Sequence, residues 1–77
     1  MATRDKLDLA DLRRQYDLAL PHSRLNPRII AAGIGVSFLT LEKWRCEGKG
    51  PVFHKLDGRV FYLKSEVEDW IAEREAA

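Results

Sequence analysis

The spacing of apolar residues predicts an amphipathic helix within residues 1–22. Its apolar positions recur every three or four residues, with charged side chains between them, at Leu9, Leu12, Tyr16 and Ala19 or Leu20. Asp5 or Asp8 is a suitable N-cap, and Pro21 with the polar residues after it ends the helix. We expect this helix to pack on the rest of the chain or to contact a partner.

Two short helices joined by a glycine-containing turn are predicted next. Asn26 is an N-cap residue followed by proline, and the short helix that it opens ends at Ala32. Residues 33–36 hold two glycines separated by one apolar residue, which predicts a tight turn. Ser37 caps a second helix, which extends to about Glu47 and is stopped by glycine. Helix, short turn and helix form the helix-turn-helix pattern.

A β-hairpin is predicted around Asp57-Gly58. The β-prone residues on its two sides are Val52, Phe53 and Leu56, then Val60, Phe61, Tyr62 and Leu63. Asp-Gly between such runs is a strong hairpin signal, because a type I′ turn needs a positive φ at both central positions.

The last helix is predicted from a capping box. Ser65 can accept a hydrogen bond from the amide of Glu68, whose side chain can reach back to Ser65. The apolar face of this helix carries Val67, Trp70, Ile71 and the stem of Arg74. Together the elements predict a mainly α fold with a small β-hairpin: a winged helix-turn-helix domain in residues 23–77 with an extra N-terminal helix in residues 1–22.

Composition narrows the classes of function. Apolar residues make up 45% of the 77 residues, no stretch is long enough to span a membrane, and no signal peptide is evident, so we expect a cytoplasmic protein. Cys46 has no disulfide partner, and His22 and His54 lack partners at a metal-ligand spacing. Without a nucleophile motif or a phosphate-binding glycine loop, we expect no enzyme activity, no metal and no cofactor.

Charge is distributed unevenly along the chain. The net charge is only +1, but residues 25–64 hold seven Lys or Arg against three Asp or Glu, whereas residues 65–77 hold one Arg against five acidic residues. A basic middle beside an acidic end indicates one face for phosphates and another for solvent. Ordinary scatter of charge in a short chain is the alternative.

A helical wheel of the second helix in the helix-turn-helix predicts its contact face. Leu41 and Trp44 point to the core, and the candidate DNA-binding residues are Ser37, Phe38, Leu39, Thr40, Glu42, Lys43 and Arg45. In a major groove, apolar side chains can contact thymine methyl groups and Lys43 can reach guanine or phosphate. The alternatives are a solvated face, burial of Phe38 against the N-terminal helix, and a bond from Thr40 to a carbonyl of its own helix.

The hairpin carries the second candidate site. Lys55 and Arg59 lie on either side of Asp57-Gly58, which places two cations near the tip of a narrow ribbon. Such a wing can follow the DNA backbone or enter a minor groove. The alternative is a solvated turn whose charges keep an edge strand from pairing.

A specific series of residues follows the N-terminal helix. In order it comprises Ala31-Ala32, Gly35-Val36-Ser37, Thr40-Leu41, Trp44-Arg45, Glu47-Gly48, Gly50-Pro51, Lys55-Leu56-Asp57-Gly58-Arg59-Val60, Tyr62 and Ser65-Glu66-Val67-Glu68-Asp69-Trp70-Ile71. This series resembles the excisionase/AlpA-type winged helix-turn-helix domain, a relative of the MerR DNA-binding domain. The resemblance covers about Leu25 to Ala72.

The resemblance implies a protein of a phage or other mobile element that binds and bends attachment-site or promoter DNA in the nucleoid. Excisionases of this type act as recombination directionality factors: they associate with each other along double-stranded DNA and direct a tyrosine integrase towards excision. Their recognition helix corresponds to Ser37 to Glu47 here, and their wing residues to Lys55 and Arg59. Family members often carry proline or arginine where Phe38-Leu39 stands, so the resemblance implies no base preference. The N-terminal helix lies outside the pattern, and the basic C-terminal tail of some excisionases is absent.

Two other functions fit the same pattern. A transcriptional regulator of this fold would bind a palindrome as a dimer, with the N-terminal helix as its dimer surface. A protein-binding adaptor would use the apolar side chains of Phe38 and Leu39 to dock on a partner such as the integrase or a polymerase.

Overall fold

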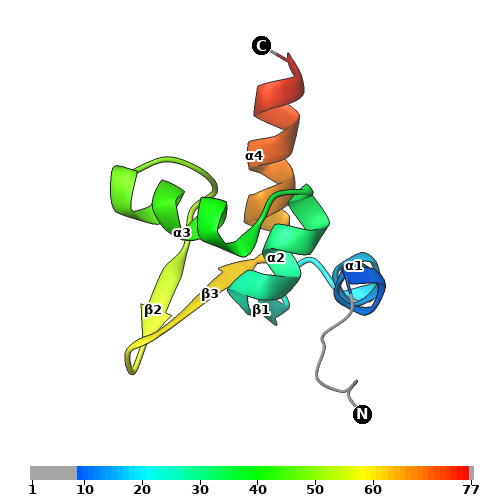
Figure 1. The fold of residues 1–77 in the computed structure, drawn as a ribbon. Coiled ribbons are helices and arrows are strands. Elements are labelled where there is room, and N and C mark those ends of the chain that lie inside the picture. Colours follow the sequence, from blue (N-terminus) through cyan, green and yellow to red (C-terminus); the bar gives the residue numbers. More distant parts are fainter. Residues whose placement is uncertain (1–8, 77) are drawn as a thin grey trace.

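Four helices and a three-stranded antiparallel sheet make up the computed structural model, which describes residues 9–76 (Figure 1). The elements are α1 (Leu9–Leu18), β1 (Arg24–Leu25), α2 (Pro27–Ile34), α3 (Phe38–Glu47), β2 (His54–Leu56), β3 (Arg59–Leu63) and α4 (Lys64–Ala76). The predicted mainly helical fold with a small hairpin is confirmed at this level. The suggested N-caps of the first helix, Asp5 and Asp8, lie outside the described residues.

The sheet is built around β3, which pairs with β1 on one side and β2 on the other. Asp57 and Gly58 have φ values of 52° and 78°, so both central turn residues have the positive φ that the sequence predicts. The third strand was not predicted. In β1 only Arg24 and Leu25 pair with β3, and two residues are too few to show an alternating pattern.

Four completely enclosed side chains form the centre of the core, each from a different element: Ile30 in α2, Leu41 in α3, Tyr62 in β3 and Val67 in α4. The other buried apolar residues are Leu12, Tyr16, Leu25, Ile29, Ala31 and Ala32. Because every element except β2 contributes to this cluster, the positions of α3 and β3 are set by one shared core.

Two tryptophans extend the core towards the end of α4. Trp44, predicted to face the core, is half-buried, and its ring centroid lies 5.5 Å from that of Trp70. Gly50 has a φ of 81°, which disfavours any larger residue, and a Cβ there would crowd the Trp44 side chain. The Arg74 guanidinium covers Trp70 at 4.8 Å from the ring centroid, so its stem joins the apolar face as predicted.

Helix α2 is longer than predicted. It begins after Asn26, whose side chain accepts a backbone hydrogen bond of 3.1 Å, and it continues to Ile34. The break therefore falls at Gly35, with a φ of 93°, and the prediction that the turn starts at Gly33 is wrong. Gly33 lies inside the helix, where the Tyr16 ring of α1 packs against it, and a Cβ there would overlap this ring.

The start of α4 also differs from the prediction. The helix begins at Lys64, so Ser65 is inside it, and the Ser65 amide donates a 2.9 Å hydrogen bond to the carbonyl oxygen of Pro21. The carboxylate of Glu68 accepts a 2.8 Å hydrogen bond from the Tyr16 hydroxyl. The predicted capping box is therefore wrong, because its two residues bind the segment around α1.

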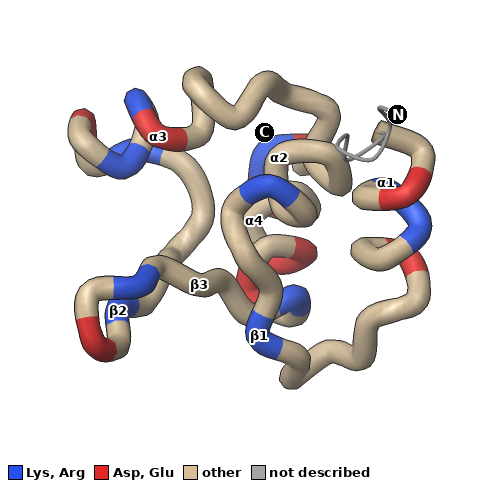
Figure 2. Tube along the Cα trace, turned by 60° about the horizontal axis from the view of Figure 1, so that its bottom comes forward, with Lys and Arg blue, Asp and Glu red and all other residues tan. Residues whose placement is uncertain are grey.

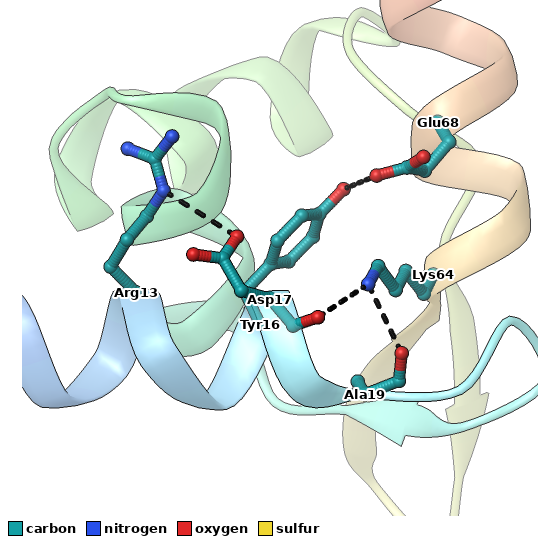
Figure 3. Close-up of polar contacts among 6 residues, drawn as sticks. All are labelled: Arg13, Tyr16, Asp17, Ala19, Lys64 and Glu68. Atoms are coloured by element: carbon teal, nitrogen blue, oxygen red, sulfur yellow. Dashed lines mark hydrogen bonds and ion pairs between the residues drawn. The ribbon is translucent and has the colours of Figure 1, made fainter.

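Helix α1 is held to α4 by three hydrogen bonds of side chains (Figure 3). Besides the bond from Tyr16 to Glu68, the Lys64 ammonium donates to the carbonyl oxygens of Asp17 at 3.3 Å and Ala19 at 3.0 Å. These carbonyls lie at the end of α1, where backbone acceptors have no partner within the helix. The N-terminal helix is therefore an integral part of the folded unit.

Replacing Gly33 with alanine tests the contact between α1 and α2. Alanine normally stabilises a helix interior relative to glycine, by about 0.5–1 kcal/mol. Here we expect the opposite, a loss of about 1–3 kcal/mol in the free energy of unfolding, because the added methyl group must displace the Tyr16 ring. Urea unfolding measures the change. A Gly33→Ala variant more stable than the parent would contradict the packing.

Alkaline unfolding tests the environment of Tyr16. Burial, followed by the hydrogen bond to Glu68, raises the pKa of the Tyr16 hydroxyl above its ordinary value. Above the unfolded value of about 10, the unfolded chain loses this proton while the folded chain keeps it, so stability falls as pH rises. We expect a smaller alkaline loss in Tyr16→Phe, measured by urea unfolding between neutral and alkaline pH. Parallel curves for the two proteins would exclude the shift.

Candidate nucleic-acid interface

The hydroxyl groups of Ser37 and Thr40 form a hydrogen bond at the start of α3. The Ser37 Oγ accepts a 3.0 Å hydrogen bond from the Thr40 amide and donates one of 2.9 Å to the Thr40 Oγ1. Ser37 is thus the N-cap that the sequence predicts, and Gly48, with a φ of 73°, ends the helix. Thr40 bonds to this cap and not to a carbonyl of its own helix. Both hydroxyl groups proposed for DNA contact therefore already have a partner in the cap.

The outward face of α3 is formed by Leu39, Lys43 and Cys46, and Leu39 and Lys43 are among the contact residues that the sequence predicts. Leu39 is 73% exposed, and Lys43 and Cys46 are also exposed. Glu42 is half-buried beside them, with its carboxylate 3.9 Å from the Arg45 guanidinium. Within residues 9–76, Lys43 therefore has no ion-pair partner, and it lies next to the exposed apolar side chain of Leu39.

Phe38 is placed differently from Leu39. It is half-buried, and the guanidinium of Arg28 in α2 covers its ring at 4.3 Å from the centroid. Phe38 and Arg28 line a hollow of about 640 Å³ whose other wall includes Leu9 and Leu12 of α1. The alternative in which Phe38 turns towards the N-terminal helix therefore describes its position better than a fully outward orientation.

Arg45 connects α3 to the base of the hairpin. Only 16% of its side chain is exposed, and its guanidinium donates a 3.2 Å hydrogen bond to the hydroxyl of the buried Tyr62. It also lies 3.9 Å from the Glu42 carboxylate and 5.8 Å from the centroid of the Phe53 ring. Nothing in the sequence marks this role, since an arginine on the flank of a recognition helix is equally suited to DNA.

The two cations of the hairpin lie on opposite faces of the ribbon. Lys55 pairs with Val60 and Leu56 pairs with Arg59, and residues opposite each other in an antiparallel pair share a face. Alternation along the strand puts Lys55 on the face of Tyr62, to which Arg45 binds, and Arg59 on the other. Both Lys55 and Arg59 are exposed near the tip, as predicted, but they point in different directions.

The face that carries Arg59 holds a second arginine that the sequence reading missed. Arg24 of β1 lies over the Phe61 ring, 5.0 Å from its centroid, and Arg24 and Arg59 both line a hollow of about 560 Å³. On the same face His54 stacks on Phe61, and its Nε2 lies 2.7 Å from the Glu66 Oε1. His54 is therefore a packing residue, and Arg24 is a candidate phosphate contact that only the short strand β1 brings into place.

Helix α3 and the hairpin lie together on the side of the molecule away from α1 (Figures 1 and 2). Figure 2 shows basic positions on α3, on the hairpin and on β1. Among residues 9–76, Lys43, Lys55 and Arg59 have no carboxylate within ion-pair distance, whereas Arg13 and Arg14 of α1 pair with acidic residues of their own helix. Three cations without a carboxylate partner among residues 9–76 on the side of α3 and the hairpin suit a polyanion.

Further observations concern metal ligands, membrane-spanning helices and similarity to known proteins. Within residues 9–76 no three His, Cys, Asp or Glu side chains are grouped as metal ligands would be, and none of the helices there has the length and apolarity that a membrane crossing requires. No protein-family model matches the sequence, and no functionally curated protein is detectably similar to it.

A double-mutant cycle tests the hydrogen bond between Arg45 and Tyr62. We expect Arg45→Ala to lower the free energy of unfolding by about 1–3 kcal/mol, because it leaves a buried hydroxyl without its partner. Tyr62→Phe should couple to it by about 1 kcal/mol. The matched control Lys43→Ala, on the outward face, should stay within about 0.5 kcal/mol of the parent. Additive effects of Arg45→Ala and Tyr62→Phe in urea unfolding would show that the two side chains do not interact.

Proposed function

We propose that this protein binds double-stranded DNA in a sequence-dependent way as a winged helix-turn-helix domain. In this proposal α2 and α3 are the helix-turn-helix, α3 enters the major groove, and the β2–β3 hairpin is the wing. The observation that carries it is the combination of an outward helix face bearing Lys43 with a hairpin bearing Lys55 and Arg59, all three without an ion-pair partner in the described part of the chain. Arg45 and Tyr62 hold the two elements in a fixed relation.

The dimensions of the two elements support this geometry. A helix with its side chains is about 10–12 Å across, which fits the major groove, about 12 Å wide. The 10 residues of α3 give it a length of about 15 Å along this groove. A hairpin tip that enters the neighbouring minor groove lies between two rows of phosphates. Because Lys55 and Arg59 point to opposite faces of the ribbon, each can meet the phosphates of a different strand.

We further propose that the DNA binding serves the role of an excisionase. It rests on the resemblance of residues 25–72 to excisionase-type domains, and it includes DNA bending, self-association along DNA, and a tyrosine integrase as partner. One domain of this size makes few phosphate contacts, which favours cooperative loading on adjacent sites. Footprinting on the attachment site of the parent element should show tandem protected segments. A single isolated half-site would contradict this role.

The packing of α1 bears on the alternative, a dimeric transcriptional regulator. Leu12 and Tyr16, the inner face of α1, are 8% and 5% exposed within one chain, so this face is not available as a dimer surface. Deleting residues 1–20 would therefore remove part of the core as well as a possible dimer contact. The mass of the complex on DNA is the better measurement, since a regulator requires two copies on one palindrome.

Selection from a pool of random duplexes tests DNA binding itself. We expect the protein to enrich a defined sequence, to bind it more tightly than the unselected pool, and to bind both more weakly as salt rises. Retention of the pool without enrichment would show binding without sequence preference. No retention at low salt would contradict the proposal and would favour a protein-binding adaptor.

Charge removal at the hairpin tests the wing. Lys55→Ala and Arg59→Ala should each weaken binding to all duplexes by a similar factor and reduce the slope of log K against log salt by about 1, because each loses one phosphate contact. Neither variant should change the melting temperature, since both side chains are exposed. Arg14→Ala on α1 is the matched control and should bind as the parent does. An unchanged salt slope in both wing variants would exclude the hairpin from the interface.

A further inference from the structure

Helix α3 opens with two apolar residues that have different surroundings. Phe38 is half-buried under the Arg28 guanidinium and lines the hollow beside α1. Leu39 is 73% exposed and points away from the enclosed Leu41. Of this pair, only Leu39 is left uncovered at the end of the helix that the proposed docking brings to the bases.

The surroundings of Leu39 indicate what it contacts. Lys43 follows one turn later on the same face and is not paired with a carboxylate among residues 9–76. The nearby Glu42 is 3.9 Å from Arg45, so its charge is partly balanced within the fold. An exposed leucine beside a cation without an ion-pair partner suits a binding partner whose surface is anionic overall but carries an apolar group.

Thymine supplies that group. Its C5 methyl is the apolar group that unmodified base pairs present in the major groove, and residues at the amino end of a recognition helix contact base edges there. We propose that Leu39 contacts a thymine methyl and makes this protein require a thymine at that position of its site. Leu39 and Lys43 are about 6 Å apart along the helix axis, so the thymine lies within about two base pairs of the position that Lys43 contacts.

This inference rests on the proposed DNA binding and adds the base that is read. It assigns Leu39 to specificity and leaves phosphate contact to Lys55 and Arg59. A partner protein is the other occupant that an exposed leucine could have. Lys43, Lys55 and Arg59, which have no ion-pair partner among residues 9–76, favour DNA over a protein surface of unspecified charge.

Deoxyuridine tests the contact, because it differs from thymidine only in lacking the C5 methyl. Each thymine of the selected duplex is replaced in turn, and the affinity is measured for the parent, for Leu39→Ala and for Leu18→Ala. Leu18 is the matched control, an equally uncovered leucine on α1 with 75% exposure. We expect one or two neighbouring replacements to weaken binding of the parent and of Leu18→Ala about three- to fivefold, the effect of losing one buried methyl group.

The Leu39→Ala variant should bind the thymine and uracil duplexes equally at those positions, and should keep the circular dichroism spectrum and melting temperature of the parent. Two results would overturn the inference while leaving DNA binding intact: indifference of the parent to every replacement, or a loss that persists unchanged in Leu39→Ala. If uracil has no effect and Leu39→Ala binds the duplex as the parent does, Leu39 is not a reading residue. Failure of the parent to bind any duplex would instead reject the proposed function as a whole.

Discussion

The guanidinium of Arg45 reaches from α3 to the hydroxyl of Tyr62, whose side chain is completely buried in the sheet. This contact joins the two elements that we propose meet DNA, and the Phe53 ring and the Glu42 carboxylate also lie near the guanidinium. A hairpin with two short strands has little stability of its own, so its direction depends on what holds its base. The proposed simultaneous use of a major and a minor groove requires this direction to be fixed before binding.

The other elements of the fold also help to fix the position of β3. Strand β1 covers the other edge of β3, and α1 closes the core through the Tyr16 ring, which packs on Gly33 and bonds to Glu68. These contacts are internal, so the extra N-terminal helix acts as structure in a chain of 77 residues. On the opposite side, α3 and the hairpin carry Lys43, Lys55 and Arg59, which have no carboxylate within ion-pair distance among residues 9–76.

Features that depend on neighbouring residues are predicted correctly from the sequence. Features that depend on a contact with a residue far away in the chain are not. Ser37 and the Asp57-Gly58 turn were predicted correctly, because a cap and a type I′ turn are determined by the residues within them. Gly33 was assigned to a turn, but its role depends on a ring in another helix. Arg45 was placed at the DNA, but a hydroxyl 17 residues away binds it. Strand β1 has no local signal, since it has only two residues and forms by pairing with Tyr62 and Leu63 of β3.

The central claim is that α3 and the hairpin contact one duplex at the same time. Backbone amide chemical shifts, recorded while a selected duplex is titrated into labelled protein, test it most directly. We predict that the amides around Lys43 and those around Asp57-Gly58 shift together at the same DNA ratio, while those of α1 stay in place. Shifts confined to one of these two elements, or centred on α1, would contradict the account.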